Sequence, residues 1–234
     1  MCENRPVWTE HGADSALAKV LDDVLCLLQW EPVSVTAAAQ KVLADRNLDE
    51  DIYFEVLAYF FPCLVSYIKA WRRQRLLEEL IADGIEVNIF GGGWEEDDFS
   101  GRVKLHGRVS YEDMLNITTF AKVVVNDEAC FNNGAHDRVF TSMLNGAVVV
   151  SEYSAYLAEE FANGQDLFLF DWRHIREQLQ VIPQLLSDDG LREKIAVSAY
   201  AKAVQRHTWQ QRAQHLLETV EMLEFKRKLE AGKN

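Results

Sequence analysis

Basic side chains are scarce in this sequence. Its 24 lysines and arginines stand against 37 aspartates and glutamates, which gives a formal net charge of −13. A protein that binds nucleic acid or an anionic membrane surface needs a basic face, because it must neutralise many phosphates. The acidic balance therefore argues against both kinds of partner, although it is compatible with a small basic pocket for a phosphorylated ligand.

Long apolar runs and paired cysteines are also lacking. No run approaches the length of a membrane span, and residues 1–10 lack the apolar centre of a signal peptide. The four cysteines, Cys2, Cys26, Cys63 and Cys130, form neither a CxxC pair nor a metal-ligand spacing. We expect a cytoplasmic protein with reduced thiols. Cys26 and Cys63 lie in apolar helical runs and are expected in the core.

Residues 13–83 show the apolar spacing of helices. Asp14 or Ser15 and then Ser34 are suited to cap the first two helices, and Pro62 predicts a kink or a new helix start. Isolated helices of this length are marginal in water, so these helices should pack on one another, on a sheet or on a second subunit. The basic run 72–75 is expected on a solvated face.

Apolar runs alternate with amphipathic helices after about residue 84. The runs are residues 85–90, 103–106, 123–125, 147–150 and 167–170. They predict an α/β fold, with a doubly wound, parallel, five-stranded sheet covered on both faces. We divide the chain into a helical region, residues 1–62, and a Rossmann-like domain, residues 63–234. In such sheets the ligand lies beyond the carboxyl ends of the strands, where the loops should form one cleft.

The stretch 132–150 has the clearest local pattern. A polar loop containing Gly134 opens an amphipathic helix between two apolar strands. Free N–H groups and the helix dipole make such a start an anion site, to which His136 and the forked guanidinium of Arg138 would add donors. The alternative is that Gly134 only makes a turn, Asp137 caps the helix and Arg138 is solvated. The residues alone leave both interpretations open.

These residues carry a resemblance to a known family. The run Gly134–Phe140, followed by Met143–Val148, resembles the nucleotide-sugar-binding half of B-fold glycosyltransferases, in particular bacterial proteins called CgeB-like or glycosyltransferase-family-1-like. The other matching pieces are Val87–Trp94, His106–Glu112, Tyr156–Phe161 and His207–Ala213. The resemblance covers about residues 60–220. It implies half of a B fold with a helical extension, a nucleotide-diphosphate sugar as donor substrate, and no metal ion or other cofactor.

The resemblance also implies a set of substrate-binding residues. Gly92 and Gly93 would approach the phosphates or the sugar, and His106 and Arg108 would border the base. The helix start with Gly134, His136, Asp137 and Arg138 would hold the diphosphate, Asn133 before it is a further substrate-binding position, and Glu159 would lie near the donor. His106 is equally well explained as a satisfied residue at the core edge, and we favour a solvated helix position for Glu159. Many relatives have glutamates where this chain has Asn133 and Thr141, so their ribose contact is not carried over.

The catalytic group is left unassigned. Asp127 and Glu128 follow the third strand and have the chemistry of a base, but the sequence does not show that they reach an acceptor. A complete B-fold enzyme has two α/β domains, and this chain has strands for one. We therefore expect the acceptor half to be missing, replaced by the helical region or held on another chain, either a homodimer partner or a different protein. The rival hypothesis is a non-catalytic nucleotide-sugar-binding or interaction module.

Overall fold

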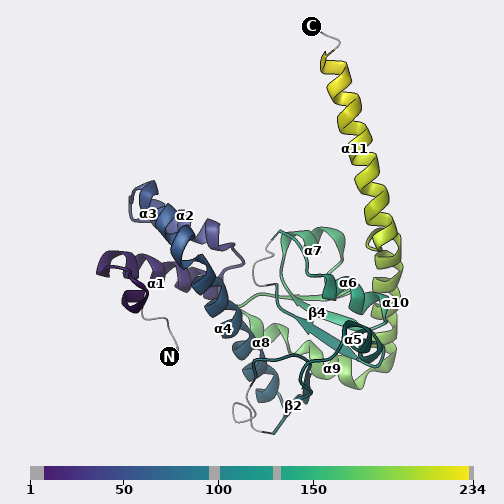
Figure 1. Cartoon of the computed structure of the whole chain (residues 1–234). Coiled ribbons are helices and arrows are strands. Elements are labelled where there is room, and N and C mark those ends of the chain that lie inside the picture. The colour runs from purple at the N-terminus through teal and green to yellow at the C-terminus, as the bar shows by residue number, and fades with distance from the viewer. Residues whose placement is uncertain (1–7, 95–100, 129–132, 232–234) are drawn as a thin grey trace.

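The computed structural model describes residues 8–94, 101–128 and 133–231, and its first part is a group of packed helices (Figure 1). These are η1 (Trp8–His11), α1 (Ser15–Trp30), α2 (Val35–Asp45), α3 (Glu50–Glu55), the π-helical turn η2 (Val56–Phe60) and α4 (Phe61–Ala82). Asp14 and Ser34 cap α1 and α2 through their side-chain oxygens, as the sequence predicts. Pro62 lies in the first turn of α4, directly after the wide turn η2, because it has no N–H to continue the preceding helix.

Helix α4 contributes to two separate cores. Leu64 and Ile68, in its first half, pack with the buried residues of α1 and α2. Leu76 and Leu80, in its second half, pack against the strands of the α/β part. The earlier helices therefore pack on α4, as expected from their apolar stripes. The expected boundary between residues 62 and 63 falls in the first turn of this shared helix.

Three parallel strands form the centre of the α/β part. They are β3 (Val123–Asn126), β4 (Val148–Glu152) and β5 (Phe168–Phe170), in the order β3-β4-β5. Every residue of β4 is buried. Its side chains alternate between two cores, since Val148 and Val150 belong to one cluster and Val149 to the other. Both faces of this sheet are therefore covered, as the unbroken apolar run of β4 predicts.

The remaining two strands form a second parallel sheet. β1 (Val87–Ile89) pairs with β2 (Val103–Leu105), and in the described residues no ladder joins either strand to β3. The α/β class and the parallel pairing are confirmed, but the five strands do not make one continuous sheet. The middle residues of this pair, Asn88 and Lys104, are polar and exposed, while the strand residues on either side of them are half-buried. This short sheet is therefore open to solvent on one face, unlike β4.

Helices cover both faces of the three-stranded sheet (Figure 1). The elements on these faces are α6 (Asp137–Leu144), α7 (Ala155–Glu160), α8 (Ile175–Gln178), α9 (Val181–Ser187) and α10 (Asp189–Arg206). Residues of α4, α8 and α9 share one core with the strands, while α6 and α7 share the other. Helix α10 contributes Ile195 to the first core and Ala199 to the second. Helix α5 (Tyr111–Thr118) lies between β2 and β3 in the chain.

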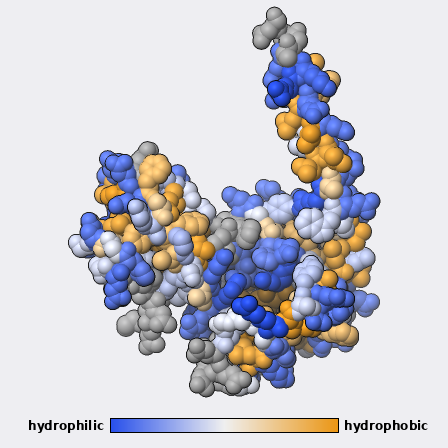
Figure 2. All heavy atoms as spheres, viewed as in Figure 1, coloured by the Kyte–Doolittle hydropathy of each residue, from blue (hydrophilic) through white to orange (hydrophobic). Residues whose placement is uncertain are grey.

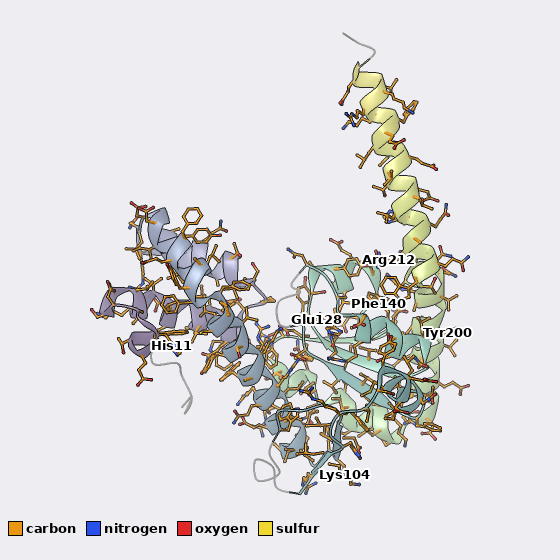
Figure 3. The ribbon with its side chains drawn as sticks, viewed as in Figure 1. His11, Lys104, Glu128, Phe140, Tyr200 and Arg212 are labelled. Carbon is orange, nitrogen blue, oxygen red and sulfur yellow. The ribbon has the colours of Figure 1, made fainter. Side chains whose placement is uncertain are left out.

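The last helix, α11 (Trp209–Ala231), extends away from the rest of the molecule (Figure 1). Its start is held by an aromatic and cationic cluster, in which the His207 ring stacks on Phe140 with centroids 4.5 Å apart and Arg212 lies over the same ring (Figure 3). Beyond that cluster, its apolar side chains, such as Leu216 and Leu223, are exposed (Figure 2).

Two expectations about apolar segments need correction. Cys26 is exposed and Cys63 is half-buried, because each lies at the edge of its helix's apolar stripe; Cys2 and Cys130 lie outside the described residues. The helical run Asp51–Ala82 also contains an 18-residue window with a mean hydropathy of 1.4, so by length and composition it could cross a membrane. Because core helices of soluble proteins pass the same test, this single run is weak support for a membrane span.

Candidate functional site

The carboxyl end of β3 is the centre of a buried polar network. Asn126, the last residue of β3, is fully buried, and its Nδ2 donates to Ser151 Oγ at 3.0 Å and to Glu128 Oε1 at 2.7 Å. Its Oδ1 accepts a hydrogen bond from Arg138 Nη1 at 2.8 Å. One amide side chain therefore connects β3 to β4 and to the start of α6. The predicted loop is thus assembled at the expected edge of the sheet.

Glu128 places a carboxylate at the start of α6 (Figure 3). Its two oxygens accept the backbone N–H of His136 at 3.1 and 3.0 Å, and the side chain is fully buried. The pKa of Glu128 is raised to about 7, mainly by burial and in part by the nearby Glu152 and Asp127, while the hydrogen bonds from His136 and Asn126 oppose this shift. Near neutral pH this group therefore exists in both its charged and its protonated form.

The end of β4 holds a buried ion pair. Arg72 Nη1 lies 2.5 Å from Glu152 Oε1, and the two side chains are 2% and 1% exposed. The second guanidinium nitrogen of Arg72 donates to the carbonyl oxygens of Leu28 at 2.6 Å and Glu31 at 3.2 Å. Burial raises the pKa of Glu152 above its ordinary value, although Arg72 opposes this shift. The pair fastens the helical region to the end of the sheet.

The burial of Arg72 corrects an expectation from the sequence. The basic run 72–75 was expected on a solvated face, yet Arg72 is among the most buried side chains of the chain. The sequence already indicated this burial, because Arg72 lies on the apolar stripe of α4. The residues Leu64, Ile68, Arg72 and Leu76 follow one another at intervals of four. A charged residue on the apolar stripe of a helix must find a buried partner.

The outer side of the network is open to solvent. Arg138 is 40% exposed, and its Nη1 lies 3.8 Å from Asp127 Oδ1. Arg73, which is 45% exposed, donates from Nε to Asp127 Oδ2 at 3.2 Å. Two guanidinium groups therefore surround one carboxylate at the mouth of the α6 loop. Both guanidinium groups are thus exposed on the side of the network from which an anionic ligand could enter.

His136, not Asp137, caps α6. The ring Nδ1 of His136 accepts the backbone N–H of Arg138 at 3.2 Å, whereas Asp137 is the first helical residue and exposes its side chain. Burial, aided by the positive charge of Arg138, lowers the pKa of His136 and favours the neutral ring that can accept this hydrogen bond. Gly134 is half-buried in the same loop and Asn133 is exposed. The cap is therefore His136, whose Nδ1 also lies 2.5 Å from Asp137 Oδ1, and not Asp137 as the turn interpretation expected.

The predicted residues that follow β1 and β2 form a second group. The backbone N–H of Gly91 donates to the carbonyl of Gly107 at 2.6 Å, which holds the two loops together. A Cβ on Gly92 would lie 3.0 Å from Arg108 Nε, which shows that the exposed Arg108 side chain folds back over this loop. His106 Nε2 lies 2.8 Å from Asn88 Oδ1, and its ring stacks on Phe90. These contacts support the interpretation of His106 as a satisfied residue.

The structure thus places the predicted site residues in two separate groups. Gly92, Gly93, His106 and Arg108 belong to the two-stranded sheet, while Asn133, Gly134, His136, Asp137 and Arg138 belong to the start of α6. Glu159 is exposed on α7, the position favoured from sequence. Glu152 and Arg72 are polar residues of the network that the sequence did not select. Among the described residues, no group of three or more acidic, histidine or cysteine side chains is placed to hold a metal ion.

The comparisons with known proteins agree with this architecture. The family described as glycosyl transferase-like matches residues 72–218, which is more than half of the chain. The chain belongs to this family. The matched segment begins at Arg72 and includes the whole polar network. No curated protein matches the chain in sequence.

Several solved structures share the fold. HepE of Anabaena in complex with UDP is 20% identical with a TM-score of 0.54, and the match covers 65% of this chain and 46% of HepE. The complex of HepE with UDP and glucose gives a TM-score of 0.55. A glycosyltransferase from Rickettsia africae is 15% identical with a TM-score of 0.52, over 64% of this chain and 44% of its own. The chain thus matches less than half the length of these proteins.

Proposed function

We propose that this chain binds a nucleotide-diphosphate sugar at the start of α6 and transfers the sugar to an acceptor. The observation that carries the proposal is the pair of exposed guanidinium groups, Arg138 and Arg73, at the mouth of the α6 loop. HepE, which shares the fold, was solved with UDP and with UDP and glucose, and this supports a uridine nucleotide as the first ligand to test.

The proposed chemistry is stabilisation of the departing diphosphate. Arg138 can give a charge-assisted fork to a phosphate, and the start of α6 adds a positive dipole end. Protonation of Glu128 near neutral pH would remove a negative charge from the same place. Such fixed positive groups lower the barrier to a leaving group that gains negative charge. In this proposal the residues Gly92, Gly93, His106 and Arg108 border the other end of the nucleotide, and no metal ion is needed.

A second candidate is a nucleotide-sugar-binding module without catalysis. The observation that favours it is the helical character of residues 8–82, because the described residues form one α/β domain where a B-fold enzyme has two. In that case the polar network would still bind the nucleotide. The acceptor would have to come with a partner chain or a second copy, or be absent altogether.

Calorimetric titration tests the proposal. UDP and UDP-glucose are titrated at neutral pH, with and without EDTA, into the full chain and into Arg138→Ala, Arg138→Lys and Arg46→Ala. Arg46 is an exposed arginine paired with Asp23 in the helical region and serves as the matched control. A transfer and hydrolysis assay on the same samples separates the two candidates, since the module predicts binding without turnover.

A further inference from the structure

A cleft of about 520 Å³ lies between the helical region and the α/β part. On one side it is lined by Trp30 and Glu31, in the connection from α1 to α2. On the other side it is lined by Tyr153, by the end of α7 and by the residues that follow β5. Its volume is within the range of small-molecule sites. The residues predicted to bind the nucleotide do not line it.

Two aromatic side chains are partly exposed in this cleft. Trp30 is 38% exposed and Tyr153 is 39% exposed. The Trp30 ring is held edge-on against Trp71, with centroids 5.5 Å apart, and the backbone N–H of Tyr153 donates to Phe170 at 2.7 Å. Partly exposed aromatic rings of this kind suit a ligand that has an apolar face and polar edges.

A rigid polar group lies in the same cleft. Asp171 accepts the ring Nδ1–H of His174 at 2.9 Å, the backbone N–H of His174 at 3.0 Å and Gln178 Nε2 at 3.1 Å. Burial raises the pKa of Asp171, but these hydrogen bonds outweigh it and hold the pKa below its ordinary value. The carboxylate of Asp171 therefore orients the His174 ring through Nδ1 and leaves Nε2 for another partner. A ring nitrogen can form a hydrogen bond with a hydroxyl group, which is both a donor and an acceptor.

The charges of the cleft argue against an anionic ligand. Its lining carries two carboxylates, Glu31 and Asp171, and one guanidinium, Arg173. Glu31 and Arg173 form an ion pair with each other, and Asp171 adds a further negative charge, so the carboxylates outnumber the guanidinium group and disfavour a phosphate. A neutral ligand rich in hydroxyl groups suits this lining, because it can place carbon–hydrogen faces on the rings and hydroxyls on the polar groups.

We propose that this cleft is a binding site for a neutral saccharide. We further identify the cleft as the site that binds the sugar acceptor, and this identification rests on the proposed function. The position supports that role, because Tyr153 follows Glu152, whose carboxylate belongs to the polar network of the nucleotide site. Arg72 also donates to the carbonyl oxygen of Glu31, so the same helix contacts both places.

Saturation-transfer NMR on the full chain tests the proposal. The probes are glucose, galactose, N-acetylglucosamine and the β1,4-linked disaccharides of glucose and N-acetylglucosamine, each without nucleotide. The expected result is transfer to at least one saccharide, with its apparent Kd raised tenfold or more in Trp30→Ala. Trp209→Ala is the matched control, because Trp209 is exposed on α11 outside the cleft. Tyr153→Ala replaces Trp30→Ala if that variant does not fold.

Parallel titrations with UDP separate this proposal from the proposed function. Trp30→Ala should lose the saccharide and keep UDP, while Arg138→Ala should lose UDP and keep the saccharide. Saccharide binding without UDP binding would support the saccharide site in the cleft and contradict the nucleotide site at the start of α6. Transfer to none of the saccharides, or equal affinity in wild type and both cleft variants, would overturn the saccharide site whatever UDP does.

Discussion

The inner and outer ends of the polar network use the same residue types in opposite ways. At the inner end Arg72 and Glu152 are almost fully buried and lie 2.5 Å apart. At the outer end Arg138 and Arg73 are about half exposed and share Asp127 at longer distances. A buried pair cannot exchange partners without leaving a charge out of water, whereas the exposed groups can turn toward a ligand. The inner end therefore holds the fold together and the outer end is available for binding.

The largest expected effect comes from breaking the inner end. Arg72→Ala leaves Glu152 buried without its cation, so the free energy of unfolding should fall by about 3–5 kcal/mol. Urea denaturation followed by circular dichroism measures this loss. The double variant Arg72→Met/Glu152→Met removes both charges and should recover most of the stability. If Arg72→Ala were as stable as the wild type, the buried pair would not hold the helical region to the sheet.

The second-largest effect is expected on the pH dependence of stability, and it arises from Glu128, whose carboxylate lies between the inner and outer ends of the network. Glu128 has a pKa of about 7 in the folded chain against an ordinary value of 4.5, so between these pH values the folded state binds a proton that the unfolded state releases. Stability should therefore fall as pH rises from about 4.5 to 7. Glu128→Gln should be more stable than wild type by roughly 3 kcal/mol at pH 8.

The pH profile of thermal unfolding supplies the measurement. The advantage of Glu128→Gln should shrink steadily below pH 7 and disappear near pH 4, because wild-type Glu128 is then protonated in both states. Glu10→Gln, at an exposed position of η1, is the matched control and should show no such trend. A pH-independent difference between wild type and Glu128→Gln would contradict the account of this carboxylate.

The smallest effect is expected at Arg73. Its exposed pair with Asp127 should contribute less than about 1 kcal/mol to stability. We expect Arg73→Ala to leave the melting temperature within the error of the measurement and to weaken UDP binding by about two- to fivefold. A loss of binding larger than that of Arg138→Ala would show that the ligand is held mainly from α4 and not from α6.

The sequence was sufficient to predict the features that local patterns determine, namely the strands, the helix starts and the loop at Gly134. The β-branched runs indicated the strands, and the parallel pairing of Val123 with Val148 is confirmed. Capping residues such as Asp14 and Ser34 placed the helix starts. The loop at Gly134 was found because one short stretch holds the turn, the cap and Arg138. These features depend on residues that are neighbours in the chain.

The sequence could not predict what depends on distant contacts. Arg72 and Glu152 are 80 residues apart, and no local pattern connects them. The division of the strands into two sheets depends on whether β1 pairs with β3, which their apolar character alone does not specify. The sequence selected Glu128 as a possible base but could not predict its burial, which depends on the position of His136 eight residues later. The cleft at Trp30 joins the two halves of the chain and has no motif.

Titration of UDP into wild type and Arg138→Ala tests the central claim most directly. Charge-assisted hydrogen bonds contribute roughly 1.5–3 kcal/mol each, so Arg138→Ala should raise the Kd about ten- to a hundredfold, and Arg138→Lys should recover part of the loss. Arg46→Ala should bind as the wild type does, and all variants should melt normally. An unchanged Kd in a folded Arg138→Ala protein, or no binding of UDP by the wild type, would contradict a nucleotide site at the start of α6.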